Sequence, residues 1–123
     1  MSILSLDHVN IATAQLKETR DFYCDVLGLT EGYRPAFAVA GYWLYVDDQP
    51  IVHLQQASDD EGRLGPVRHF ALCVASLDEV TKLLDRADVA YRRTQTPDGV
   101  FEQVFLRDPS GAQLELICRR PSA

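Results

Sequence analysis

The stretch HFALCVASLDEVTKLL (residues 69–84) repeats the pattern of HVNIATAQLKETRDFY (residues 8–23). A shift of 61 residues, about half the chain, places His69 on His8 and Glu79 on Glu18. The identities are few, but apolar residues recur at the same intervals in both stretches. Because self-similarity at a fixed interval indicates repeated structural units, we expect two copies of one unit.

Each copy changes from the spacing of a strand to the spacing of a helix. At first, apolar residues occupy every second position, as in a strand with one buried face, and His8 and His69 fall on the opposite face. Apolar residues then recur at helical intervals. Ser76 is well placed to cap the second helix, and Gly28 is well placed to end the first. Each copy therefore predicts a strand followed by a helix.

Two hairpin patterns follow the helices, GYWLYVDDQPIVHLQQ (residues 41–56) and EQVFLRDPSGAQLELICR (residues 102–119). When their turns are matched, VHL aligns with LEL, so His53 is the counterpart of Glu115. The charged, glycine-containing stretch at about residues 58–66 is the expected linker. We predict a single α+β domain made of module 1, about residues 1–57, and module 2, about residues 67–123.

Composition limits the class of protein. With 123 residues, 46% of them hydrophobic, the chain is long enough for one domain with its own core. A formal net charge of −6 argues against nucleic acid as a partner, since nucleic-acid binding needs a basic surface. No apolar run approaches the roughly 20 residues of a membrane span, and the first residues lack a signal-peptide pattern. We expect a cytoplasmic protein whose three cysteines are reduced and mostly buried.

Three histidines and one glutamate occupy two pairs of equivalent positions. His8 matches His69 through the repeat, and His53 matches Glu115 through the hairpins. If a pseudo-twofold axis relates the halves, these four side chains can converge, and imidazole with carboxylate suits Fe²⁺, Mn²⁺, Co²⁺, Ni²⁺ or Zn²⁺. A single histidine on a strand is more often a surface or hydrogen-bonded residue, and Glu115 alone fits a water-facing position. The symmetrical set nevertheless favours a divalent metal site.

The segments DHVNIAT, TRDFYCDVLGL, RHFAL and FLRDPSGAQLELI resemble the vicinal oxygen chelate superfamily, and the resemblance covers nearly the whole chain. That superfamily includes glyoxalase I, extradiol dioxygenases, fosfomycin-resistance transferases and bleomycin-resistance binding proteins. The resemblance implies two βαβββ modules curled into an eight-stranded cup around a divalent metal, in a chain that forms a homodimer. It also implies His8, His69 and Glu115 as metal ligands, with His53 at a fourth position that varies in the family.

The resemblance leaves the reaction open. Ala12 and His53 differ from the residues typical of glyoxalase I, while Asn10 and Phe105 differ from those typical of the fosfomycin-resistance enzymes. Extradiol dioxygenases use the same two histidines and glutamate with an acid–base histidine, which His53 would supply, although Phe105 stands where they carry a tyrosine. His53 can therefore serve as a fourth ligand or as a general base.

We expect a metal-dependent enzyme that chelates adjacent oxygens of a small-molecule substrate in a lyase, isomerase or ring-cleaving reaction. The expected catalytic residues are His53 and Glu115. Aromatic rings in the pocket suit an apolar or planar substrate, and the expected pocket wall contains Asn10, Trp43, Tyr45 and Phe105. The alternative is a metal-free protein that sequesters a small molecule, as the bleomycin-resistance proteins do.

Overall fold

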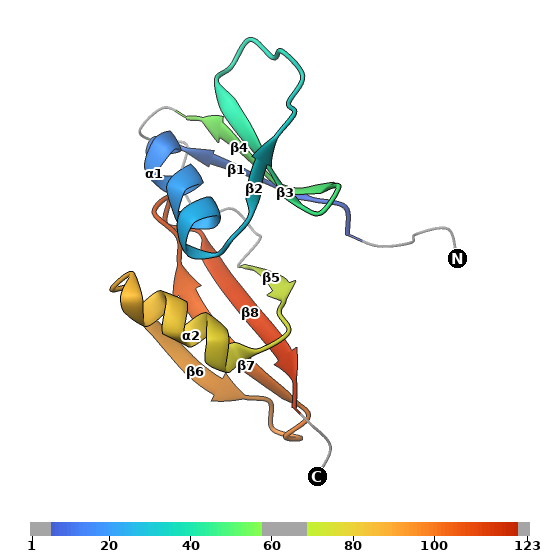
Figure 1. Cartoon of the computed structure of the whole chain (residues 1–123), viewed down its shortest axis with the longest axis vertical. Helices are drawn as coiled ribbons and strands as arrows, with labels where there is room; N and C mark the ends of the chain where they lie inside the picture. The colour runs from blue at the N-terminus through green and yellow to red at the C-terminus, as the bar shows by residue number, and fades with distance from the viewer. Residues whose placement is uncertain (1–5, 58–68, 121–123) are drawn as a thin grey trace, which may run out of the picture. The chain divides into compact units, whose positions relative to one another are not determined.

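The computed structural model describes residues 6–57 and 69–120 of the chain (Figure 1). The chain divides into two compact units, residues 1–63 and 64–123, which are called module 1 and module 2 below. In each module a strand, a helical segment and three further strands follow one another, and the strands form a four-stranded sheet. The predicted α+β fold of two βαβββ modules is therefore confirmed. The linker predicted at about residues 58–66 lies outside the described residues.

Module 1 has a mixed sheet with the strand order β1-β4-β3-β2. β1 runs parallel to β4, whereas the other neighbouring strands are antiparallel. The elements are β1 (Val9–Thr13), α1 (Leu16–Asp21), the π-helical segment η1 (Phe22–Val26), β2 (Thr30–Gly32), β3 (Gly41–Val46) and β4 (Gln49–Gln56).

Module 2 repeats this arrangement with the strand order β5-β8-β7-β6. Here β5 runs parallel to β8, and the remaining pairs are antiparallel. The elements are β5 (Phe70–Cys73), α2 (Leu77–Arg86), β6 (Tyr91–Gln95), β7 (Phe101–Arg107) and β8 (Gln113–Arg119). The same connectivity in both modules confirms the internal repeat.

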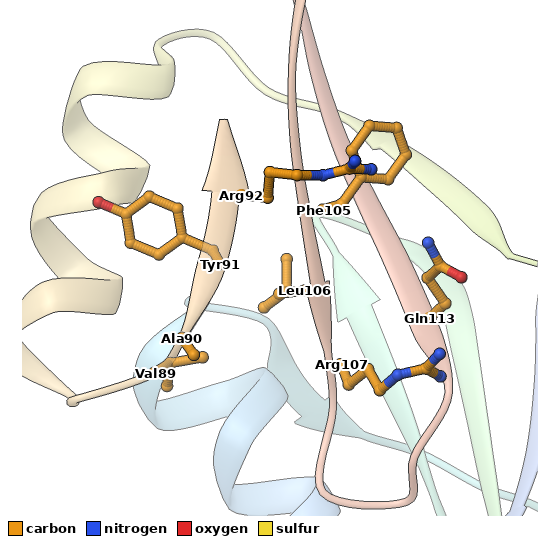
Figure 2. A pocket seen from close by; sticks show the side chains of 8 residues that line it. All are labelled: Val89, Ala90, Tyr91, Arg92, Phe105, Leu106, Arg107 and Gln113. Atoms are coloured by element: carbon orange, nitrogen blue, oxygen red, sulfur yellow. The ribbon is translucent and has the colours of Figure 1, made fainter. Parts of the chain in front are cut away.

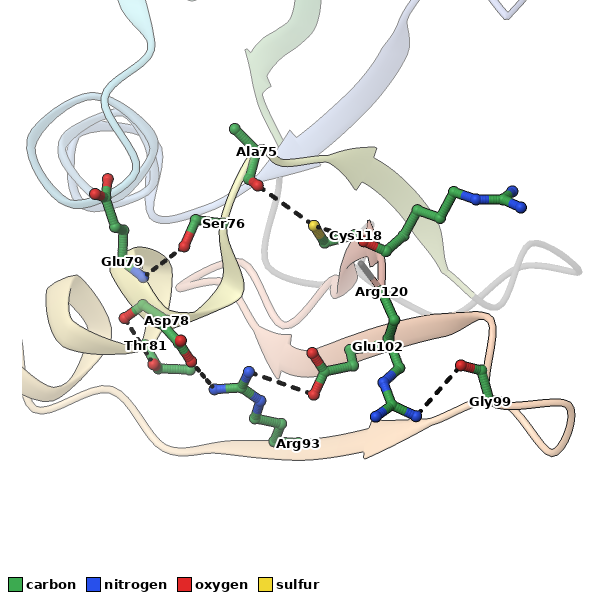
Figure 3. Close-up of polar contacts among 11 residues, drawn as sticks. Ala75, Ser76, Asp78, Glu79, Thr81, Arg93, Gly99, Glu102, Cys118 and Arg120 are labelled. Carbon is green, nitrogen blue, oxygen red and sulfur yellow. Dashed lines mark hydrogen bonds and ion pairs between the residues drawn. The ribbon is translucent and has the colours of Figure 1, made fainter. Parts of the chain in front are cut away.

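Local sequence signals set the boundaries of α2 and of the second hairpin. Ser76 caps α2 as predicted, because its hydroxyl accepts a hydrogen bond from the backbone N–H of Glu79 at 3.3 Å (Figure 3). The turn between β7 and β8 falls where the sequence predicts it. Gly111 has a φ of 90° there, a conformation that glycine adopts without steric cost.

The helical segment of module 1 differs from the single α-helix that its sequence predicts. α1 ends at Asp21, and η1 continues with a wider turn in which the Leu27 N–H donates to the carbonyl of Phe22 at 3.2 Å. The adjacent Phe22 and Tyr23 side chains are both buried in this segment. Gly28 ends it with a φ of 86°, as predicted.

Each module has its own apolar core. Because side chains alternate along a strand, one face of each sheet turns its residues toward the helical segment. The largest buried apolar side chains are Tyr23, Leu44, Val52 and Leu54 in module 1 and Leu84, Val104, Leu114 and Leu116 in module 2. Within the part of the chain that the structure describes, no helix is long and apolar enough to cross a membrane.

The three cysteines form no disulfide in the structure, and the prediction that they are mostly buried is wrong. Cys24 and Cys118 are half-buried, and Cys73 is exposed. The physical reason for Cys73 is its position in β5, where alternation turns its neighbour Leu72 toward the apolar side and Cys73 away from it.

Candidate functional site

His53 of module 1 and Glu115 of module 2 occupy the same position in their sheets. Trp43 of β3 lies opposite His53 of β4, and Phe105 of β7 lies opposite Glu115 of β8. The neighbours on the other side, in β1 and β5, are also equivalent, because each follows its repeated histidine by two residues. The alignment of the two hairpin sequences thus corresponds to the alignment of the two sheets.

Both side chains are buried although they point away from the apolar cores. Their neighbours along each strand are aliphatic residues buried in those cores, so alternation turns His53 and Glu115 to the other face. His53 is 8% exposed and Glu115 is 6% exposed. Buried polar groups require hydrogen-bonding or metal partners, so the water-facing alternative for Glu115 does not apply.

Three aromatic rings form a stack on this face of module 1. The His53 ring lies between His8 and Trp43, with centroid distances of 3.9 and 4.0 Å and interplanar angles of 11° and 12°. His8 Nδ1 lies 2.8 Å from Oδ1 of Asp7, and His53 Nε2 lies 3.0 Å from the carbonyl oxygen of Pro50. Each histidine is therefore held by its ring and by one of its nitrogens.

These contacts decide which nitrogen of each neutral imidazole keeps its lone pair. A carboxylate and a carbonyl only accept hydrogen bonds, so the protons are assigned to Nδ1 of His8 and Nε2 of His53. Nε2 of His8 and Nδ1 of His53 are left to bind a metal or take a proton. Burial, followed by the charge of His8, lowers the pKa of His53 below its usual value, which keeps the ring neutral at neutral pH.

Module 2 brings the other two candidate residues together by itself. Nε2 of His69 lies 3.2 Å from Oε1 of Glu115. The side-chain amide of Gln103 donates to Oε2 of the same carboxylate at 3.1 Å. The ring of Phe105 meets the His69 ring edge to face, at 6.1 Å and 88°. The carboxylate is thus held at both oxygens, and His69 is oriented by an aromatic neighbour.

The donor set of these pairs fits a divalent metal. Two ligand atoms about 2.1 Å from an ion are about 3.0 Å apart at a right angle and about 3.4 Å apart at the tetrahedral angle. The 3.2 Å between His69 and Glu115 lies in this range. The Asp7–His8 contact is the carboxylate–histidine arrangement that commonly orients a metal-binding imidazole. Among residues 6–57 and 69–120, no three His, Cys, Asp or Glu side chains gather as a complete ligand set.

A pocket of about 370 Å³ adjoins the ring stack in module 1. Asn10, Trp43 and His53 line it from the sheet, and Arg34 and Phe37 line it from the loop between β2 and β3. The pocket therefore includes two of the predicted wall residues and the candidate base. Tyr45 is not among these lining residues, and its hydroxyl donates to the carbonyl of Tyr33 at 2.6 Å, so its place in the wall stays a prediction.

A second pocket, of about 500 Å³, lies in module 2 (Figure 2). Phe105 lines it together with Arg92 and Arg107, whereas Asn10 and Trp43 line the other pocket, so the place of Phe105 in a common wall stays a prediction. Figure 2 shows the Arg92 side chain extending over the Phe105 ring, and its guanidinium carbon lies 5.1 Å from the ring centroid.

Sequence reasoning missed several residues that hold the candidate groups in place. Gln103 lies two residues from Phe105 in the same strand, so the two side chains share a face. This spacing could have indicated that Gln103 lies near the site. Asp7 precedes His8 directly, and its role was visible in the DH pair. Pro50 acts through its backbone carbonyl, which no side-chain pattern reports. Arg34 lies in a loop without periodicity, so nothing in the sequence connects it to His53.

Comparisons with known proteins agree with this fold. The sequence model of the Glyoxalase/Bleomycin resistance protein/Dioxygenase superfamily matches residues 5–116. A protein of Arabidopsis thaliana named Glyoxylase I 4 is 28% identical over 125 residues, which cover 94% of this chain and 71% of that protein.

Solved structures with the same fold include a glyoxylase/bleomycin resistance protein/dioxygenase domain from Frankia sp. EAN1pec. Its TM-score is 0.79 at 19% identity, covering 97% of this chain and 100% of that one. The lactoylglutathione lyase of Agrobacterium tumefaciens has a TM-score of 0.71 at 18% identity, with 96% of both chains covered. TnmS3, an antibiotic binding protein from Streptomyces sp. CB03234, has a TM-score of 0.75 at 17% identity, covering 98% and 99%. With a family match that spans both modules, this chain belongs to the Glyoxalase/Bleomycin resistance protein/Dioxygenase superfamily.

Proposed function

We propose that this chain is a metal-dependent enzyme that binds a small molecule through two neighbouring oxygens. Its reaction is of the lyase or isomerase type, or an extradiol-type ring cleavage. The proposed ligands of a divalent ion are His8, His69 and Glu115, supplied by one chain or by the two chains of a homodimer. The proposed location is the cytoplasm.

The observation that carries this proposal is the 3.2 Å contact between His69 and the buried Glu115. A hydrogen bond spans the same distance, but two further features favour a metal. Gln103 fixes the second oxygen of the carboxylate, as second-sphere groups do for metal ligands. Asp7 accepts a hydrogen bond from Nδ1 of His8, which leaves the lone pair of that ring on Nε2, where it can bind a metal. Two histidines and one carboxylate form a ligand set that keeps other positions open for substrate.

The ring stack favours a general base as the role of His53. Imidazole binds a metal in its own plane, and the His8 and His53 rings are stacked within 11° of parallel at 3.9 Å. His8 would therefore hold the ion, and the stacked His53 ring would remain available as a base. The neutral His53 ring, with its lone pair on Nδ1, is able to take a proton from a substrate in the adjoining pocket.

The protein's own residues supply positioning and proton transfer. A divalent ion, when bound, would stabilise negative charge that develops on the substrate oxygens. Asn10 and Trp43 line the pocket beside His53 and would orient the substrate there. Phe105 adjoins His69 and presents an apolar surface.

The test is elemental analysis of protein purified without oxygen, before and after treatment with a chelator. We expect close to one ion per site in the wild type, and loss of that ion from His69→Ala. Glu115→Gln keeps a hydrogen-bonding group of the same size but removes the charge, so it also loses the ion. Glu102→Gln, a carboxylate change on β7 next to Arg93, is the matched control and keeps it. A wild type that holds none of the five candidate metals after reloading contradicts the proposal.

The second candidate is a non-catalytic protein that sequesters a small molecule. The aromatic lining of the module 1 pocket, with Phe37 and Trp43 6.2 Å apart, favours it, and TnmS3 is an antibiotic binding protein with the same fold. Stoichiometric ligand binding that a chelator leaves unchanged, without turnover, would support this function over the first.

A further inference from the structure

Arg34, in the loop between β2 and β3, has a buried N–H group without a partner. Among the described residues, its Nε is the buried side-chain nitrogen or oxygen that lacks a hydrogen bond. A buried donor left unsatisfied is destabilising and calls for an explanation, such as a group that binds there. The position of this atom therefore carries information about what the protein binds.

The surrounding residues hold the guanidinium in place. Its carbon lies 4.9 Å from the centroid of the Phe37 ring, and Nη2 donates to the carbonyl of Val39 at 3.0 Å. Gly41 makes room for it, because a Cβ at that position would lie 2.8 Å from Nη2 and 2.9 Å from the guanidinium carbon. Stacking on a ring leaves the N–H groups at the edge of the guanidinium able to bind an anion.

Arg34 differs from the arginines that have structural roles. Arg93 contacts Asp78 at 2.9 Å and Glu102 at 3.4 Å (Figure 3). Arg20 contacts Glu31 at 2.8 Å. Within the described residues, no carboxylate forms an ion pair with Arg34, although the chain has an excess of acidic residues. Its positive charge is therefore available to a ligand.

Arg34 lines the same pocket as Asn10, Trp43 and His53. We propose that Arg34 binds an oxyanion of the substrate, a carboxylate or a phosphate, through its unpartnered Nε–H in this pocket. That the bound oxyanion belongs to a substrate rests on the proposed function, whereas the binding of an oxyanion does not. The pocket volume of about 370 Å³ is at the small end for ligand sites, which indicates a small metabolite. The substrate class is thus a small anion with an apolar or planar part.

The first test observes the wild type directly. Benzoate, phenyl phosphate and neutral benzamide are titrated into metal-free protein, and the Nε–H signal of Arg34 is followed by ¹⁵N NMR. We expect benzoate or phenyl phosphate to shift this signal to lower field and benzamide to leave it unchanged. The tighter of the two anions identifies the oxyanion. An Arg34 signal that moves with neither anion overturns the inference.

The second test uses two matched variants. Arg34→Lys keeps the positive charge but removes the Nε–H group, and we expect it to weaken anion binding about tenfold. Arg119→Lys is the control, because Arg119 also lies over a ring, that of Phe101 at 5.7 Å, but lines neither pocket described here. Wild-type affinity in Arg34→Lys overturns the inference, provided its amide spectrum shows the native fold.

Failure of this inference and failure of the metal proposal are distinguishable. The anion titration uses protein without metal and is repeated with His69→Ala, in which we expect unchanged anion binding. Metal analysis of Arg34→Lys is expected to match the wild type. A failure to bind anions at Arg34 therefore does not contradict the metal proposal. A failure to bind metal likewise does not contradict the anion proposal.

Discussion

Gln103 of β7 lies diagonally across from Glu115 of β8, two residues from its direct partner Phe105, and the amide of Gln103 donates to the carboxylate oxygen that His69 does not contact. This bond fixes the orientation of a buried carboxylate. It also has a direct consequence for metal affinity, because groups that orient a ligand are commonly worth about 10–100-fold in metal binding.

We therefore expect Gln103→Leu to weaken metal binding by about 10–100-fold. The leucine is similar in size but cannot hold Oε2 of Glu115. Titration with the metal found in the purified protein measures the change. Gln95→Leu, at an exposed position of β6, is the control and should bind as the wild type does. Equal metal affinities in the two variants would show that Gln103 does not contribute to metal binding.

Substitution of His53 separates its two possible roles. In His53→Phe the ring stack is kept, but both nitrogens are lost. If His53 is a base, the variant retains the metal and loses turnover by about 10²–10⁴-fold, the usual contribution of general acid–base catalysis. Retained metal in His53→Phe, with loss of metal in His8→Phe, is the expected pair of results. Loss of metal from both would make His53 a ligand.

The core of module 2 offers a paired test of packing. Leu84 is fully buried in α2, while its neighbour Leu83 is 38% exposed. We expect Leu84→Ala to lower the free energy of unfolding by roughly 2–5 kcal/mol, because it leaves a cavity. Leu83→Ala should cost less than about 1 kcal/mol. Denaturation with urea, monitored by circular dichroism, measures both, and similar losses would contradict the assigned burial.

The loop before β7 gives a pH-dependent prediction. The hydroxyl of Thr96, followed by the backbone N–H of Val100, lowers the pKa of Asp98 below its ordinary value of 3.8. Since the folded-state pKa is the lower one, the stabilisation is present above pH 3.8 and is lost as the pH falls through the folded pKa. In Thr96→Val we expect an NMR titration to give a higher pKa for Asp98. An unchanged value would mean that the hydroxyl has no effect.

Much of the fold was predictable because two patterns repeat with the same period. The equivalence of His53 and Glu115 followed from two matched turns, since strand register is fixed by turn geometry and by the buried face. The π-helical segment after Asp21 was not predictable, because an α-helix and a π-helix share nearly the same apolar spacing over so short a stretch. The spacing of apolar residues therefore predicted the strands of both sheets correctly, but it did not predict the change from α-helix to π-helix in the first helical segment.

The candidate site was only partly predictable for a different reason. His8, His69 and Glu115 are chemically distinctive and fall on strands with clear alternation. Gln103 and Arg34 act through contacts that depend on the pairing of β7 with β8 and on the path of a loop. Such contacts are tertiary, so a residue's type and spacing do not reveal them.

The ring stack of module 1 gives the protein an optical reporter of its own. Trp43 is the sole tryptophan of the chain, and its ring lies 4.0 Å from that of His53 at the wall of the pocket. All tryptophan emission therefore originates at one place. A molecule that enters this pocket, or a proton gained by His53, changes the surroundings of that single fluorophore, so occupancy can be followed in real time without a label.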